Sequence, residues 1–180
     1  LYLVHALHRS LAVPGDVCEF GVARGSTSAL IAHEILDTDR MLWLFDSFQG
    51  LPAPTQEDVL IDDVCDLGSM EKYQGVFAFP ETEVRGRVAG AGLPSERTQV
   101  VPGFVEQTLA GGRDLPERVC FAYVDMALYH PIQIALDFLH DRLRSGAQIM
   151  VAASGFFSAC APKPVAAFPA RPPRTLPPPL

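Results

Sequence analysis

The chain reads Val17-Cys18-Glu19-Phe20-Gly21-Val22-Ala23-Arg24-Gly25 near its beginning, and this stretch decides the fold. Its first four residues form a short apolar run that is typical of a strand, and the two glycines that follow are typical of a turn. A helix is then expected, with Ser26 as its cap. The buried stripe of this helix has the spacing of a helical face and consists of Ser28, Ile31, Ala32, Ile35 and Leu36. The sequence therefore predicts a strand that passes into a helix through a glycine turn.

Apolar strands and helical stripes continue to alternate along the chain. Further strands are expected over residues 42–45, 99–102, 119–124 and 148–151. A helix between the last two is expected to place Pro131 at its first position, to bury a stripe that reaches Leu143, and to close at Ser145-Gly146. Strands that alternate with helices indicate an α/β fold, here a Rossmann-like, doubly wound and mostly parallel sheet. Residues 52–97 are less regular, and we expect a lid or substrate-facing insertion there, with a helix over residues 81–88.

Length and composition favour a single domain in a water-soluble protein. The 180 residues carry 14 basic and 21 acidic side chains, so no basic field is available for nucleic acid. No apolar run approaches the roughly 20 residues that span a bilayer, and no cationic signal region precedes the first helix. A cytoplasmic protein without nucleic-acid or membrane partners is expected. Residues 1–160 would form the domain and residues 161–180 a proline-rich tail, while the missing initiator methionine suggests a fragment.

The first strand carries an acidic residue, Glu19, one position before its end at the glycine turn. Ligands of open parallel sheets bind at the carboxyl ends of the strands, so Glu19 is placed to meet one. A carboxylate suits an ammonium or another cationic group better than a pyrophosphate. The turn also has only the glycines of a GxxxG pattern, whereas dinucleotide sites carry GxGxxG, so a nicotinamide cofactor is disfavoured. A tight turn without any ligand remains the alternative.

Asp46 ends the second strand and is a candidate for binding a ribose. A carboxylate can accept hydrogen bonds from both ribose hydroxyls, although aspartate also commonly ends strands and caps helices. Taken together, Glu19 and Asp46 describe a pocket for a nucleoside that bears a cationic amino acid, which is S-adenosylmethionine.

Three segments carry a resemblance to a known family. They read Asp46-Ser47-Phe48-Gln49-Gly50-Leu51-Pro52, Glu19-Phe20-Gly21-Val22-Ala23-Arg24-Gly25 and Val124-Asp125-Met126-Ala127-Leu128-Tyr129. With them, residues 15–160 resemble the macrocin O-methyltransferase (TylF/MycF) family. The resemblance implies a class I S-adenosylmethionine-dependent enzyme that methylates a hydroxyl of a small molecule, a sugar or an aromatic natural product, usually with magnesium. The cofactor-binding residues that it implies are Glu19, Gly21, Ala23, Gly25, Ser26, Asp46 and Ser47.

The chain departs from this family where the family binds magnesium. The family typically shows Asp-Gly-Asp-Leu-Tyr after the fourth strand and Asp-Asp-Tyr after the fifth. Here the stretches are Asp125-Met126-Ala127-Leu128-Tyr129 and Ala152-Ala153-Ser154, so Asp125 is the only matching ligand. Magnesium prefers several oxygen ligands in near-octahedral order, and methyl side chains provide none. We therefore expect S-adenosylmethionine as the cofactor and no intact magnesium site.

Without a metal, a side chain must activate the acceptor hydroxyl. Asp125 and His130 are the catalytic candidates, because both lie near the carboxyl end of the fourth strand and histidine titrates near neutrality. An exposed residue at a helix start is the alternative for His130. Two functions remain open: an O-methyltransferase whose metal role has been lost or reassigned, and a catalytically inactive relative that binds S-adenosylmethionine or acts through association.

The end of the chain raises a second question about the sheet. Class I methyltransferases generally add two strands after the fifth, the last one antiparallel, and residues 161–180 contain no convincing pair for them. Eight of the 16 prolines fall between residues 162 and 179, and proline cannot donate to a central sheet ladder. The C-terminal part of the sheet is therefore expected to be incomplete, and an uncovered edge favours a homodimer or aggregation.

Overall fold

A computed structural model describes residues 1–111, 114–152 and 157–158. Within these ranges, five parallel strands form the main sheet in the order β4-β2-β1-β5-β6. The strands are β1 (Asp16–Phe20), β2 (Leu42–Asp46), β4 (Thr98–Pro102), β5 (Val119–Val124) and β6 (Leu143–Val151). The order reverses between β1 and β5, so the sheet is doubly wound and the predicted α/β class is confirmed.

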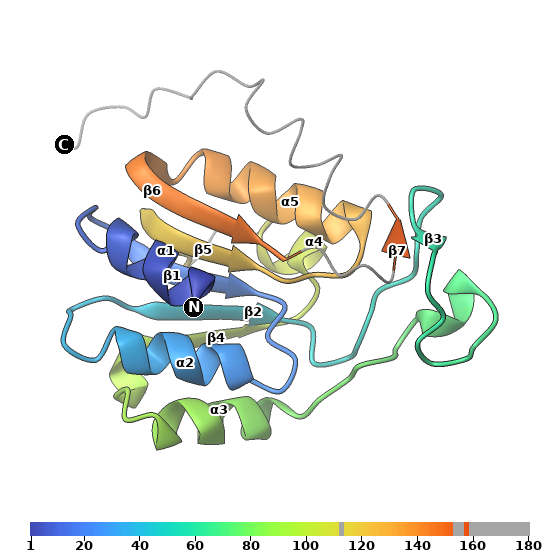
Figure 1. Ribbon diagram of the computed structural model, residues 1–180, viewed down its shortest axis with the longest axis horizontal. Coiled ribbons are helices and arrows are strands. Elements are labelled where there is room, and N and C mark those ends of the chain that lie inside the picture. The colour runs from blue at the N-terminus through green and yellow to red at the C-terminus, as the bar shows by residue number, and fades with distance from the viewer. Residues whose placement is uncertain (112–113, 153–156, 159–180) are drawn as a thin grey trace.

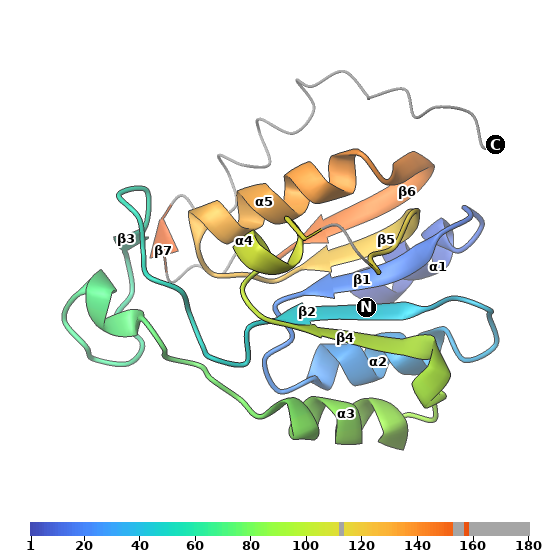
Figure 2. The ribbon, with the colours of Figure 1, turned by 180° about the vertical axis from the view of Figure 1, so that it is seen from behind.

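Helices cover both faces of this sheet (Figure 1). On one face lie α1 (Tyr2–Ser10), α2 (Ser26–Glu34) and α3 (Glu81–Gly90), which share a buried cluster with the sheet. The opposite face, seen from behind in Figure 2, carries α4 (Val105–Thr108) and α5 (Tyr129–His140). Alternate residues of β1 face opposite clusters, with Val17 buried on the first face and Cys18 on the second. The strands are therefore buried on both sides, as their continuous apolar runs predict.

Three aromatic rings fill the core beneath the carboxyl ends of β1 and β2. Phe20 and Phe45 stack with ring centroids 4.5 Å apart, and Phe138 of α5 meets each ring edge-on at 6.1 Å. Aromatic pairs in these geometries add to the stabilisation that their burial provides. The residues that follow these two strands, Gly21 and Asp46, therefore stand on a rigid base.

The start of α2 differs from the prediction. Gly25 caps the helix with a φ of 78°, no side-chain cap bond is present, and Ser26 is already the first helical residue. The entry into the helix needs a left-handed backbone, which glycine adopts readily and serine does not.

Both ends of α5 also differ from the prediction. The helix begins at Tyr129, so Pro131 is its third residue, and it ends at His140. Arg142 closes that end by donating to the backbone oxygens of Phe138 and Pro116. Ser145-Gly146 lies inside β6, where the register against β5 shifts and Gly146 has a φ of 91°. The Ser-Gly pair marks an irregularity of a strand, not the end of a helix.

The irregular segment predicted over residues 52–97 is shorter in the structure, because α3 packs with α1 and α2 on one face of the sheet. Val84 and Val88 of α3 are buried in the cluster that α2 shares. Residues 52–80 instead project beyond the carboxyl ends of the strands, as Figure 1 shows. This excursion contains β3 (Val59–Leu60) and the short 3-10 helix η1 (Met70–Tyr73), and a second 3-10 helix, η2 (Ser95–Arg97), precedes β4. β3 pairs antiparallel with β7 (Phe157–Ser158).

A buried aspartate ties the excursion to α5. The Asp58 side chain is 6% exposed, its Oδ1 accepts a hydrogen bond from the backbone nitrogen of Tyr129 at 2.8 Å, and its Oδ2 accepts bonds from the backbone and hydroxyl of Thr55. By accepting from Tyr129, Asp58 satisfies one of the N–H groups in the first turn of α5 that have no partner within the helix. Asp58 therefore fixes both the excursion and the residue at which α5 begins.

Replacing Asp58 with alanine is expected to destabilise this connection. The change leaves two backbone N–H groups without their acceptor, which should cost about 1–3 kcal/mol. Hydrogen exchange followed by mass spectrometry should show faster exchange over residues 52–80 and at the start of α5, with little change in β1 and β2. The exposed neighbour Glu57, replaced with alanine, serves as the matched control, and equal exchange in the two variants would contradict this role.

The open edge of the sheet and the tail are only partly described. Among the described residues, β6 pairs with β5 and with no other strand. Residues 161–180, which include the predicted tail, lie outside the described ranges, as do Ala153 and Ser154. Dimerisation through this edge therefore stays a prediction. In the described part of the chain, no helix is both long and apolar enough to cross a membrane.

Candidate functional site

Two adjoining cavities open at the carboxyl ends of the strands. The first is lined by the ends of β2 and β4, by α4 and by the start of α5, with Asp46, Phe104 and Glu106 among its residues. The second is lined by the end of β1, the glycine turn and the start of α2, together with Asp125. Gly21 and Ala127 line both cavities, so the two meet there. The strand ends that the sequence singled out are thus brought together at one edge of the sheet.

Gly21 lies where the two cavities meet and has no room for a side chain. Its φ is 81°, and a Cβ atom would stand 2.3 Å from the backbone oxygen of Asp125. The turn is held on both sides, because Gly21 donates to the oxygen of Phe45 and the backbone nitrogen of Asp125 donates to the oxygen of Phe20. The missing side chain leaves the floor between the two cavities open to a ligand.

Asp46 joins the end of β2 to the glycine turn. Its Oδ2 accepts hydrogen bonds from the backbone nitrogens of Val22 at 2.8 Å and Ala23 at 3.1 Å, and its Oδ1 accepts one from Phe48 at 2.8 Å. The carboxylate therefore orders the turn and also lines the first cavity. Ala23 lines the second cavity and has a φ of 48°, a strained conformation for a residue other than glycine.

Ser47 shapes the tight turn of the heptapeptide that begins at Asp46. Its hydroxyl donates to the oxygen of Gly50 and accepts from the backbone nitrogen of Gln49. Gly50 has a φ of 81°, and a Cβ there would stand 2.4 Å from the oxygen of Gly75. Leu51 exchanges backbone hydrogen bonds with the Gly75-Val76 pair, which closes the base of the excursion. Ser47 thus has a structural role, and it also lines the first cavity.

Glu19 is a buried acid on the floor of the second cavity. The residue is 1% exposed, and Ser28 of α2 donates a hydrogen bond of 2.5 Å to its Oε2. Burial raises the pKa of Glu19 to about 8, the hydrogen bond from Ser28 opposes this rise, and the nearby Asp125 and Asp46 add to it. The free protein therefore holds Glu19 largely protonated at neutral pH, in a place where a cation would favour its charged form. Sequence reasoning missed this role of Ser28, although a serine within a buried helical stripe is a signal for it.

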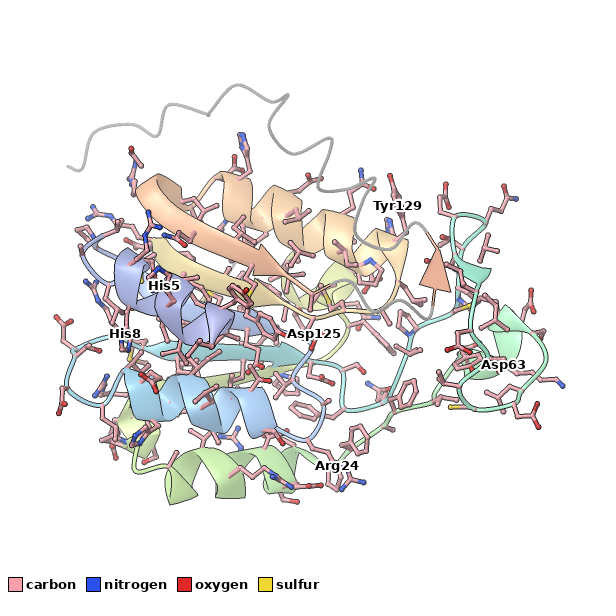
Figure 3. All side chains as sticks on the ribbon, viewed as in Figure 1. His5, His8, Arg24, Asp63, Asp125 and Tyr129 are labelled. Atoms are coloured by element: carbon pink, nitrogen blue, oxygen red, sulfur yellow. The ribbon has the colours of Figure 1, made fainter. Side chains whose placement is uncertain are left out.

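Asp125 is the acidic group at the end of β5. It is exposed and lines the second cavity, and Figure 3 shows it near the carboxyl ends of the strands. The Tyr123 hydroxyl donates to its Oδ2 at 3.2 Å. Partial burial raises the pKa of Asp125, and the bond from Tyr123 opposes the rise. Burial and Asp125 together raise the pKa of Tyr123 to about 12, so Tyr123 remains a donor.

His130 is not brought into this arrangement. It is an exposed residue in the first turn of α5, and it lines neither of the two cavities. Of the two predicted catalytic residues, the structure therefore places only Asp125 at the site.

Among the positions where the family carries metal ligands, Asp125 keeps its carboxylate and Ala152 and Ala153 offer no oxygen side chain. Ala127 lines both cavities, and the backbone of Ala152 donates to Val124 directly after β6. In the ranges that the structure describes, no three histidine, cysteine, aspartate or glutamate side chains are grouped so that they could hold a metal ion. Ala153 lies outside those ranges. The donor set found beside Asp125 does not fit a hard divalent cation.

The outer wall of the second cavity is aromatic, a feature that sequence reasoning missed. Phe77 and Phe79 of the excursion line it, and the Arg24 guanidinium lies 4.6 Å from the centre of the Phe79 ring. Phe77 is 43% exposed and has a φ of 64°. A strained, exposed aromatic residue at the mouth of a cavity offers an apolar face to a ring-shaped ligand. Figure 3 shows Arg24 beside the start of α3, where its guanidinium also lies 3.5 Å from Oε1 of Glu83.

Known proteins provide an independent comparison. A sequence model of the macrocin-O-methyltransferase (TylF) family matches residues 5–171. A tetracenomycin 4'-O-methyltransferase of Streptomyces olivaceus, which acts on 8-demethyl-8-(2,3-dimethoxy-alpha-L-rhamnosyl)-tetracenomycin C, is 33% identical over 144 residues, 77% of this chain and 52% of that protein. Mycinamicin III 3''-O-methyltransferase of Micromonospora griseorubida is 32% identical over 115 residues, 59% of this chain and 44% of that protein. The chain thus spans about half the length of these curated relatives.

Solved structures agree with this result. The O-methyltransferase NovP superimposes with a TM-score of 0.72 and 25% identity over 94% of this chain and 69% of its own. The calicheamicin methyltransferase CalS11 gives a TM-score of 0.63 and 27% identity over 82% of this chain and 61% of its own. The glycine turn, the heptapeptide after β2 and the doubly wound sheet all lie within the matched residues. The chain belongs to the macrocin O-methyltransferase (TylF) family.

Proposed function

We propose that this chain is an S-adenosylmethionine-dependent O-methyltransferase that acts on a hydroxyl of a sugar or an aromatic small molecule. The observation that carries the proposal is the pair of cavities that meet at Gly21, one with the buried acid Glu19 and the other with Asp46. An elongated ligand fits these two adjoining cavities, with its cationic end in the cavity of Glu19 and its nucleoside end in the cavity of Asp46. Family membership supports the same reaction.

The methionine end of the cofactor would occupy the second cavity. Glu19 would face its cationic ammonium group, and the first turn of α2, which begins at Ser26 after Gly25, would face its carboxylate with backbone N–H groups. Asp46 would accept a hydrogen bond from a ribose hydroxyl. Its Oδ1 accepts one bond from a described residue, the nitrogen of Phe48, and a carboxylate oxygen has capacity for a second donor from the first cavity.

Asp125 is the residue that we propose as the proton acceptor. When bound, S-adenosylmethionine supplies an electrophilic methyl group. Tyr123 occupies Oδ2 of Asp125, so Oδ1 is left to hold the acceptor hydroxyl and to take its proton. The raised pKa of Asp125 makes its carboxylate a stronger base than an ordinary aspartate. Because Ala127 and Ala152 provide no oxygen ligands, we propose that this step proceeds without magnesium.

The apolar mouth of the second cavity supports a ring-shaped acceptor. Phe77 can cover one face of a sugar or an aromatic ring while the hydroxyl of that ring points toward Asp125. One relative named above acts on a rhamnosyl-tetracenomycin, and another acts on mycinamicin III.

Calorimetric titration with S-adenosylmethionine tests the cofactor and the metal together. Binding is expected with equal affinity in magnesium chloride and in EDTA. A lack of binding in both buffers would exclude the methyltransferase function, and tighter binding or faster turnover with magnesium would contradict the metal-independent reaction. Asp125→Asn should keep the cofactor affinity within a few-fold and lose turnover with a panel of sugars and phenols by about 100-fold or more. A wild-type chain that binds the cofactor and methylates no acceptor would favour the inactive relative instead.

A further inference from the structure

Asp58 is a buried acid that the proposed mechanism does not use. It is 6% exposed, and both of its carboxylate oxygens accept hydrogen bonds, which is how a buried carboxylate is stabilised. The bonds from Thr55 to Oδ2, at 2.8 and 2.9 Å, close a local turn within the excursion. The bond from the backbone nitrogen of Tyr129 to Oδ1, at 2.8 Å, instead reaches a residue 71 positions further along the chain. This second bond is not needed for the turn, so it points to a separate role.

The bond from Tyr129 fixes one end of the loop that carries Asp125. This loop, residues 125–128, joins β5 to α5 and lines both cavities. At its beginning, the backbone nitrogen of Asp125 donates to the oxygen of Phe20 at 2.8 Å. At its far end, the bond to Asp58 holds the first residue of α5. The loop is therefore attached to β1 on one side and to the excursion on the other.

We propose that Asp58 is a positioning residue, which holds the carboxylate of Asp125 at the right distance from an acceptor that lies against the excursion. The inference rests on the proposed function and deepens it, because it takes Asp125 as the proton acceptor and Phe77 as part of the acceptor wall. Asp58 lines neither cavity, so it acts through the loop and not by touching a ligand. A displacement of about 1 Å at a reacting group can cost about 100-fold in rate. Turnover should therefore depend on Asp58, whereas cofactor affinity, which the proposed function places on Glu19 and Asp46, should depend on it little.

Changes at Asp58 and Thr55 separate the bonds of the two carboxylate oxygens. Asp58→Ala removes the bonds of both oxygens, Asp58→Asn keeps a carbonyl oxygen for Tyr129, and Thr55→Val removes only the hydroxyl bond to Oδ2. With the acceptor of the panel that the wild type methylates best, Asp58→Ala should lower kcat by about tenfold or more and leave KM nearly unchanged. Asp58→Asn and Thr55→Val should keep kcat within about threefold of the wild type. The dissociation constant of S-adenosylhomocysteine should stay within about threefold in every variant.

Changes at Tyr129 remove the same bond from the donor side. Tyr129→Pro has no backbone N–H, whereas Tyr129→Ala loses the same ring and keeps the donor. Proline is tolerated at the first position of a helix, and Leu128 already has the extended backbone, φ -114° and ψ 152°, that a residue before proline requires. Both variants should therefore fold, and the kcat of Tyr129→Pro should be about tenfold or more below that of Tyr129→Ala.

Glu57→Ala, at the exposed neighbour, is the matched control and should turn over as the wild type does. If Asp58 only supports the fold of the excursion, Asp58→Ala should raise KM at unchanged kcat, and Tyr129→Pro should match Tyr129→Ala. That outcome refutes the positioning role and leaves the proposed function standing. If the wild type binds no S-adenosylhomocysteine or methylates no acceptor, the proposed function and this inference are both refuted. Circular dichroism at the assay temperature shows which variants are folded, and the comparison of the two Tyr129 variants holds if Asp58→Ala is unfolded.

Discussion

Replacing Gly21 with alanine is expected to abolish cofactor binding and to lower the free energy of unfolding by more than about 3 kcal/mol. The new Cβ would stand 2.3 Å from the backbone oxygen of Asp125 and 2.8 Å from its carbonyl carbon, and neither is the flexible end of a side chain. The residue would also have to keep a φ of 81°, which L-amino acids rarely adopt. Relief requires β1 and β5 to separate at the point where the two cavities meet. Urea denaturation and titration with S-adenosylhomocysteine measure the two effects.

The matched control is Gly86→Ala in α3. No heavy atom lies within 4 Å of a Cβ built at Gly86, and its backbone conformation is helical. Alanine is favoured over glycine inside a helix by about 1 kcal/mol, so this variant should be slightly more stable than the wild type and should bind the cofactor normally. If Gly21→Ala unfolds at the same urea concentration as Gly86→Ala, the close approach of the two strand ends does not limit the fold.

Replacing Glu19 with glutamine is expected to stabilise the chain at alkaline pH. The pKa of Glu19 rises from 4.5 in the reference state to about 8 in the folded state. The folded chain then holds a proton that the unfolded chain releases, and the stability of the wild type falls as pH rises between these two values. Glutamine cannot ionise, so the free energy of unfolding of the variant does not fall over this pH range through residue 19. The variant should match the wild type near pH 4 and exceed it by several kcal/mol near pH 9.

The same variant should bind the cofactor more weakly, because an amide cannot balance an ammonium group. Stability is measured by urea denaturation at pH 5, 7 and 9, and affinity by titration at pH 7. Glu57→Gln removes an exposed carboxylate of the excursion and controls for the loss of one negative charge. A stability difference between wild type and Glu19→Gln that stays constant with pH would show that Glu19 is charged throughout.

Local patterns were sufficient to predict the sheet and the acidic strand ends. β2 and β5 follow the expected residues because a strand buried on both faces needs a continuous apolar run, and each run stops at an aspartate. The prediction that Ser145-Gly146 ends a helix was wrong, because a Ser-Gly pair occurs both at helix ends and in irregular strands. The pairing of Leu143 with Val119 shows that the Ser-Gly pair lies in a strand. This pairing joins residues that are far apart in the sequence, so a local pattern does not report it.

The site was predicted only where its chemistry follows a strand. Glu19, Asp46 and Asp125 lie where the sequence placed them, although their roles toward a ligand stay proposals. The bond from Tyr129 to Asp58 joins residues 71 positions apart, and no periodicity reports such a contact.

The closed base of the excursion has a consequence for engineering. Since Leu51 binds the Gly75-Val76 pair on both of its backbone groups, the chain between them leaves and re-enters the molecule at one point. Such a segment is a side branch of the fold, comparable to an Ω-loop. Lengthening or exchanging it changes the closure entropy only slowly with length and leaves the register of β2 and β4 untouched. An exchanged segment must keep Asp58, because the bond from Tyr129 to Asp58 fixes the start of α5, and it leaves Phe77 and Phe79 in place, because both follow Val76.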